Sequence, residues 1–251
     1  MEILDTQIIS YAFKNTYSGQ VTRQHIVSIT AKEFLLVQNT EKAKVNYHIP
    51  LSHRLILPPE TEWNLPKRDH PFSRNLTDQI ILEFGQDYPA ISEYGNLAIA
   101  EMINLRQKRL FKETVRFLNK EMRKTILRRF DFLLEQEISC VPLSRSGVEI
   151  GLSLFYEFVS QYTTKQNSRN TIYDILILAT AIDSSAILTT QDSLLSRFAS
   201  EQFHGNFTEN VGILSIDFGK SKDADKRKRR ESKSYINKGW RASLKNYQGA
   251  W

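Results

Sequence analysis

The segment YDILILATAIDSSAILTTQDSLL (residues 173–195) decides the fold class of this chain of 251 residues. Its first half is a strongly apolar helix pattern with Asp174 near the start, and residues 186–189 are apolar enough for a buried strand. A turn is expected at 190–192, and a short helix follows it. A buried strand between two helices is typical of an α/β protein with a parallel sheet.

The same alternation of strands and helices recurs on both sides of this segment. The chain begins with a short apolar run at 1–5 that predicts a strand, and a helix is expected at 6–14. Further elements are predicted as a strand leading into a helix within 26–39, a strand at 138–142, a helix at 147–162 and a last strand within 211–219. This order predicts an α/β sandwich with a mostly parallel sheet, whose functional groups gather beyond the carboxyl ends of the strands.

The middle of the chain follows a different pattern. Residues 40–90 hold six of the seven prolines and predict loops with short strands. Residues 92–136 contain neither proline nor a glycine after Gly95 and repeat apolar side chains every three or four positions, which predicts one or two long amphipathic helices. Ten Lys and Arg residues lie between Arg106 and Arg129. A solvated helix face is the favoured explanation for these charges, and nucleic-acid contact is the alternative.

Composition narrows the protein class. One cysteine, Cys140, excludes a disulfide within the chain and is expected to be a small core residue in a reducing compartment. The N-terminus lacks the basic residues of a signal peptide, and no apolar run reaches the roughly 18 residues of a membrane span. We therefore expect a soluble, cytoplasmic protein without a membrane partner.

The net charge of +6 is unevenly distributed, because residues 220–251 hold 11 basic and 3 acidic side chains. This segment predicts a flexible basic C-terminal tail. Its most basic part is Lys226, Arg227, Lys228, Arg229 and Arg230, which would bind nucleic-acid phosphates. The alternative is a terminus that only increases solubility.

Four carboxylates follow or begin predicted elements at comparable positions: Asp5, Glu33, Asp174 and Asp192. Singly, each has a structural explanation as a helix cap, a charge near a helix N-terminus or an exposed helix residue. Together at one sheet edge they would repel one another unless a cation offset their charge. Oxygen ligands favour Mg²⁺ or Mn²⁺, and two such ions suit phosphodiester hydrolysis.

These residues also carry a family resemblance. ILDTQIISYAFK (3–14) resembles the opening of PIN-domain ribonucleases, particularly the VapC toxin type, and SITAKEFLL (28–36) resembles their second motif. The segment 173–195 is similar to their third and fourth motifs, and 138–159 fits the strand and helix before them. The resemblance implies an α/β/α nuclease fold that cuts RNA with Mg²⁺ or Mn²⁺. It further implies Asp5, Glu33, Asp174 and Asp192 as metal ligands, with Thr6 or Thr190 as supporting hydroxyls.

The resemblance covers two separated parts of the chain. We predict a PIN-like domain over 1–219, with its core at 1–39 and 138–218, a long helical insertion at 40–137 and the tail at 220–251. Gln7 departs from the Asn usual at this point of the family's first motif. Gln7 also disfavours a haloacid-dehalogenase-type phosphatase, which would need an Asp there as general acid.

The expected function is a metal-dependent endoribonuclease, the toxin of a toxin–antitoxin or defence system. An antitoxin or other protein partner and a homodimer are further expectations from the resemblance. The alternative is a catalytically degenerate PIN fold that binds RNA or a protein, although four retained carboxylates favour the enzyme.

Overall fold

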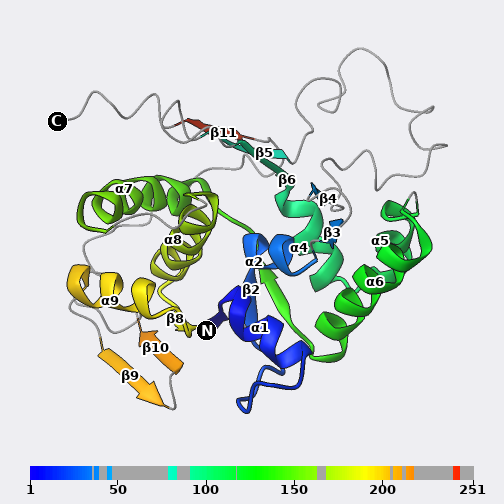
Figure 1. The fold of residues 1–251 in the computed structure, drawn as a ribbon, viewed down its shortest axis with the longest axis horizontal. Coiled ribbons are helices and arrows are strands. Elements are labelled where there is room, and N and C mark those ends of the chain that lie inside the picture. Colours follow the sequence, from blue (N-terminus) through cyan, green and yellow to red (C-terminus); the bar gives the residue numbers. More distant parts are fainter. Residues whose placement is uncertain are drawn as a thin grey trace. The chain divides into compact units, whose positions relative to one another are not determined.

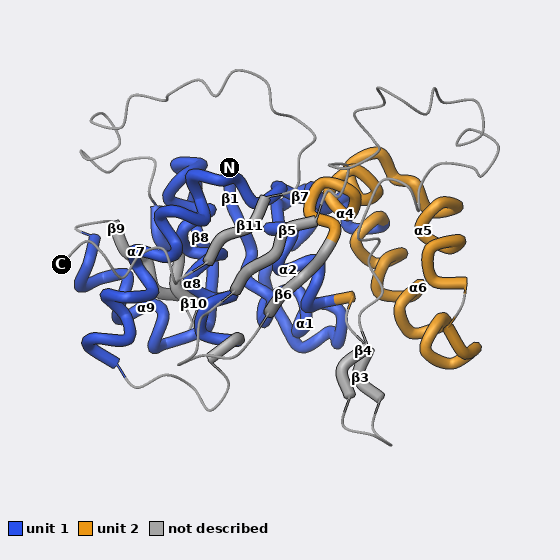
Figure 2. The backbone as a smooth tube through the Cα atoms, turned by 90° about the horizontal axis from the view of Figure 1, so that it is seen from above, with its two compact units in different colours: residues 1–34, 135–231 blue, residues 35–134, 232–251 orange. Residues whose placement is uncertain are grey.

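The computed structural model describes residues 1–35, 37–39, 44–46, 79–83, 91–116, 118–162, 168–203, 206–210, 213–217 and 240–243. The chain divides into two compact units (Figure 2). Unit 1 comprises Met1–Phe34 and Glu135–Glu231, and unit 2 comprises Leu35–Leu134 and Ser232–Trp251. Each unit is therefore described by itself.

Unit 1 is built on a six-stranded sheet in the order β7-β2-β1-β8-β10-β9 (Figure 1). Its strands are β1 (Glu2–Leu4), β2 (His25–Val27), β7 (Ser139–Val141), β8 (Ile187–Thr190), β9 (Asn206–Asn210) and β10 (Ile213–Asp217). The first four in sequence run parallel, with Leu4 opposite both Ile26 and Thr189. β10 pairs antiparallel with both β8 and β9, so the sheet is mixed.

The helices of unit 1 are α1 (Thr6–Phe13), α2 (Ser28–Phe34), α7 (Arg145–Gln161), α8 (Ser168–Asp183) and α9 (Ser193–Gln202). α7 packs along α8, and Gly151 makes the approach close, since a Cβ built there would lie 2.6 Å from Leu176 Cδ2. The core includes Ile3 and Leu4 of β1 and Leu188 of β8, all fully buried. Three consecutive elements, α8, β8 and α9, confirm the order predicted for residues 173–195.

Unit 2 contains α4 (Asn96–Asn104), α5 (Lys108–Thr114) and α6 (Lys120–Glu135), the last of which runs one residue into unit 1. A three-stranded sheet has the order β11-β5-β6, made by β11 (Trp240–Ser243), β5 (Gln79–Glu83) and β6 (Ile91–Gly95). A separate hairpin pairs β3 (Val37–Asn39) with β4 (Lys44–Asn46). Phe111 of α5 stacks on Phe130 of α6 at 3.9 Å between ring centroids.

The α/β class is confirmed, but two finer expectations are met only in part or are wrong. The sheet is parallel across β7, β2, β1 and β8 and is mixed as a whole, because β9 and β10 form an antiparallel extension. The segment 92–136 forms a strand and three helices instead of one or two long helices. Arg106, at a φ of 53°, separates α4 from α5, and Asn119 accepts from Met122 N at 2.9 Å where α6 begins.

Two other predicted regions are described only in part. The predicted tail contains β11, which pairs in parallel with β5, while Lys226–Arg230 lies outside the described residues. Most of the irregular segment 40–90 also lies outside them. None of the helices that the structure describes combines the length and the apolar character needed to cross a membrane.

Candidate functional site

Asp5 lies at the carboxyl end of β1 and is 1% exposed. Its backbone N–H donates to Thr189 O at 3.0 Å, which continues the pairing of β1 with β8. Its carboxylate accepts from Thr6 N at Oδ1 (2.6 Å) and from the Thr190 hydroxyl at Oδ2 (2.7 Å). Asp5 is therefore both the N-cap of α1 and an acceptor at the end of the neighbouring strand.

Thr190 connects the ends of β1 and β8. Its side chain is fully buried, and its hydroxyl accepts from Asp192 N at 3.0 Å while it donates to Asp5. Asp192 in turn caps α9, since its Oδ1 accepts from Leu194 N at 2.9 Å and from Leu195 N at 3.0 Å. One threonine hydroxyl thus fixes both aspartates relative to each other.

Glu33 joins this arrangement through α1. The Thr6 hydroxyl donates to Glu33 Oε2 at 2.6 Å, which connects the first residue of α1 with the sixth residue of α2. Glu33 is half-buried, and α2 begins directly after β2, the strand beside β1. The sheet therefore places residues 5 and 33 on neighbouring elements although 27 residues separate Thr6 from Glu33.

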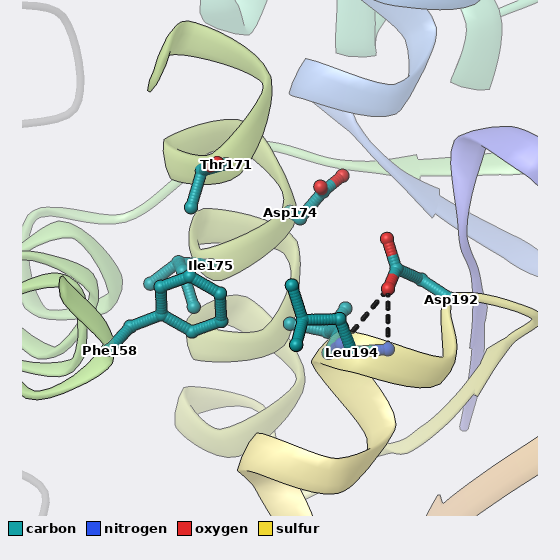
Figure 3. Close-up of a pocket in the computed structure, with 7 residues that line it drawn as sticks. Phe158, Thr171, Asp174, Ile175, Asp192 and Leu194 are labelled. Atoms are coloured by element: carbon teal, nitrogen blue, oxygen red, sulfur yellow. Dashed lines mark hydrogen bonds between the residues drawn. The ribbon is translucent and has the colours of Figure 1, made fainter. Parts of the chain in front are cut away.

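Asp174 lies in the second turn of α8 and lines a small pocket together with Asp192. The remaining lining residues are Phe158, Thr171, Ile175, Leu194 and Leu195. Figure 3 shows the Asp174 and Asp192 carboxylates at the same side of this pocket. The hydrogen bonds to α9 end on one oxygen of Asp192, and the other oxygen points to the side on which Asp174 lies (Figure 3).

Hydrogen bonds connect three of the four predicted carboxylates, and the fourth, Asp174, lines the same pocket as Asp192. The connections run from Glu33 through Thr6 to Asp5, then through Thr190 to Asp192, and across the pocket to Asp174. Both hydroxyls named from the resemblance, Thr6 and Thr190, take part. Within the described residues, however, no three His, Cys, Asp or Glu side chains are grouped closely enough to hold a metal ion.

Sequence reasoning missed a buried polar pair beside this set. Lys32, which precedes Glu33, is 8% exposed, and its ammonium donates to the hydroxyl of Tyr173, which precedes Asp174 and is 3% exposed. The ammonium lies 4.1 Å from the centroid of the Tyr173 ring. The pair links α2 to α8 next to two of the predicted ligands. A lysine among the apolar residues of SITAKEFLL was the available signal.

Two further titratable groups in unit 1 have shifted pKa values. Burial raises the pKa of the Cys140 thiol, which is 3% exposed, so this residue has the character of a core side chain, as predicted. Burial also lowers the pKa of His25 from its ordinary 6.5, the N-terminal ammonium adds to this effect, and a hydrogen bond with the Glu2 backbone opposes it.

No protein-family model matches the sequence, and no match was found among curated proteins or solved structures.

Proposed function

We propose that the chain is a metal-dependent endoribonuclease of PIN type, which hydrolyses RNA phosphodiester bonds. The observation that carries this proposal is the set of hydrogen bonds that connects Asp5, Glu33 and Asp192, together with Asp174 in the pocket that Asp192 lines. Asp5 and Asp192 are buried, and burying a charged group is costly unless partners offset the cost.

The topology of unit 1 supports the same family. In the order β7-β2-β1-β8, the crossover from β1 to β2 and the crossover from β7 to β8 run in opposite directions across the sheet. Because parallel crossovers are right-handed, α1 belongs on one face and the α7–α8 pair on the other. Such an arrangement would form an α/β/α sandwich with its chemistry at the carboxyl ends of parallel strands, which supports the proposed family.

The donor chemistry of the four residues fits Mg²⁺ or Mn²⁺, since all of them offer carboxylate oxygens. Asp5, Asp174 and Asp192 would hold the metal, with Glu33 as a further ligand. When bound, the metal would supply a water of lowered pKa and a positive charge for the phosphate.

The chain's own residues would prepare this site. Thr190 holds the Asp5 carboxylate against rotation, and Thr6 does the same for Glu33. Asp192 is fixed by two backbone N–H groups of α9. Such support limits the freedom of the side chains and keeps their oxygens oriented toward a ligand.

The test is a cleavage assay with the full chain, labelled single-stranded RNA and Mn²⁺, beside direct measurement of Mn²⁺ binding. We expect Asp174→Asn to abolish cleavage and weaken Mn²⁺ binding, because it removes a ligand charge next to Asp192. Glu157→Gln, an exposed change on α7 with the same loss of charge, is the control and should retain both. Cleavage that persists in EDTA or in Asp174→Asn would refute the metal mechanism.

A second candidate is a PIN-like fold that binds RNA without cutting it. It is favoured by the lack, among the described residues, of a group of three acidic, His or Cys side chains placed to hold a metal. In that case the wild-type chain would bind RNA but leave it intact in Mn²⁺.

The toxin assignment depends on the resemblance of the motifs to the VapC type. It implies growth arrest on expression of the wild-type chain and its relief by Asp174→Asn. An antitoxin and a homodimer belong to this proposal and would appear as a co-purifying protein or as a doubled mass in solution.

A further inference from the structure

Charge is divided unequally between the described helical region of unit 2 and the part of unit 1 that holds the four carboxylates. Residues 95–134 contain ten Lys and Arg against four Asp and Glu, a net charge of +6. Residues 1–34 and 135–203 contain seven Lys and Arg against eleven Asp and Glu, a net charge of −4. A polyanion would be repelled by the second region and attracted by the first.

Helices α5 and α6 hold their basic side chains on a packed scaffold. The stacked rings of Phe111 and Phe130 join the buried sides of the two helices. Arg123 Nη1 donates to Arg116 O at 3.3 Å, just after the end of α5. The outward sides of both helices are consequently fixed by their inward packing.

Four of the cations on these outward sides have no acidic partner among the described residues. They are Arg109 and Lys112 on α5 and Lys120 and Lys124 on α6, and all four are exposed. Two acidic residues of these helices pair with other cations, since Glu113 lies 3.8 Å from Arg116 and Asp131 lies 2.8 Å from Lys108. Arg109 and Lys112 are three residues apart, and Lys120 and Lys124 are four residues apart. The two side chains of each helix therefore share one helix face, with their Cβ atoms about 5–6 Å apart.

We propose that these four cations, Arg109 and Lys112 of α5 with Lys120 and Lys124 of α6, bind the phosphate backbone of RNA independently of base sequence. The choice of RNA as the polyanion rests on the proposed function, while the need for a polyanion rests on the unpartnered charges. Among the described side chains of unit 2, the only large apolar residue that is exposed is Leu105. Without an exposed aromatic side chain for base stacking there, the contacts are expected to be electrostatic.

The probe is a fluorescein-labelled 20-nucleotide poly(U), and binding is measured by anisotropy at 50–200 mM salt in EDTA. The variant replaces all four cations by glutamine. Four fewer contacts should reduce the slope of log affinity against log salt by about 2.8, which corresponds to roughly 50-fold over this salt range. Because EDTA prevents metal-dependent cleavage, failure of the nuclease proposal and failure of this proposal give separate results.

The matched control removes four exposed cations from unit 1 instead: Lys14, Arg23, Arg145 and Arg197, each changed to glutamine. It lowers the net charge by the same amount and should retain the slope of the wild-type chain. Equal loss in both variants would overturn the proposal, because total charge would then explain binding. An unchanged slope in the first variant would overturn it too, as would binding of phosphatidylserine vesicles in place of poly(U).

Discussion

The Thr190 hydroxyl gives the sharpest test of how the candidate site is held together. Thr190→Val preserves the shape of a fully buried side chain but removes the group that donates to Asp5 and accepts from Asp192 N. A hydrogen bond to a charged group is worth about 1.5–3 kcal/mol, and a buried N–H left without a partner costs about 1–3 kcal/mol. We expect the free energy of unfolding to fall by about 3 kcal/mol.

The assay is urea denaturation followed by circular dichroism of the helices, with thermal melting beside it. A loss of about 3 kcal/mol corresponds to a melting temperature roughly 6–12 °C lower in a chain of this size. Thr180→Val is the matched control, because Thr180 is equally buried and its hydroxyl donates only to the Leu176 carbonyl within α8. This control should cost about 1 kcal/mol or less.

A double-mutant cycle with Asp5→Asn then isolates the contact itself. The coupling between positions 5 and 190 should be about 1.5–3 kcal/mol if Asp5 is held as a charged acceptor. The reasoning is refuted if Thr190→Val and Thr180→Val cost the same, or if the cycle gives no coupling. In that case, the carboxylate would not depend on the end of β8 for its position.

Three further predictions concern packing and charge in unit 1. Gly151→Val should lower the free energy of unfolding by about 1–3 kcal/mol by overpacking, since even a Cβ would lie 2.6 Å from Leu176 Cδ2. Adding Leu176→Ala should recover part of the loss in melting temperature. If nothing is recovered, the strain does not come from contact with Leu176. Lys32→Met and Tyr173→Phe should each lower the free energy of unfolding by about 1–3 kcal/mol, because each leaves a buried polar partner behind. The double variant should lose less than the sum of the two single losses. Additive losses in urea unfolding would contradict this coupling. Because the pKa of His25 is lowered in the folded chain, the unfolded chain binds more protons, and the free energy of unfolding should decrease as the pH falls through 6.5. His25→Asn should flatten this pH dependence between pH 7.5 and 5. An unchanged profile would exclude His25 as its source.

The sequence was most informative where local pattern and tertiary context agree. The strands at 2–4 and 187–190 are short runs followed within two residues by helix-capping aspartates, so both their type and their ends were predictable to within about two residues. The parallel pairing of β1 with β8 also brings Asp5 and Thr190 together. The proximity of these residues therefore followed from strand order, once the strands were recognised.

Other features depended on contacts that local pattern does not encode. The break after α4 uses a left-handed Arg106, a residue type that gives no warning of positive φ, in contrast to glycine. β9 was missed, although the two residues between it and β10 include Gly212, a hairpin signal. The burial of Lys32 could have been suspected, but its partner Tyr173 could not be predicted because 141 positions separate the two residues.

The two oxygens of each carboxylate show how Asp5 and Asp192 can be helix caps and still take the proposed role of ligands. Asp5 Oδ1 accepts from Thr6 N and Asp192 Oδ1 from two N–H groups of α9, so both residues are caps. The second oxygen of Asp5 accepts from Thr190, and that of Asp192 points toward Asp174 (Figure 3). Capping therefore does not compete with ligand binding. It fixes the carboxylate by one oxygen and orients the other, and the helix N-terminus also stabilises the negative charge. Asp5→Ser and Asp192→Ser should preserve much of the helix stability and remove Mn²⁺ binding. If the two aspartates were helix caps alone, the serine variants would bind Mn²⁺ as the wild-type chain does.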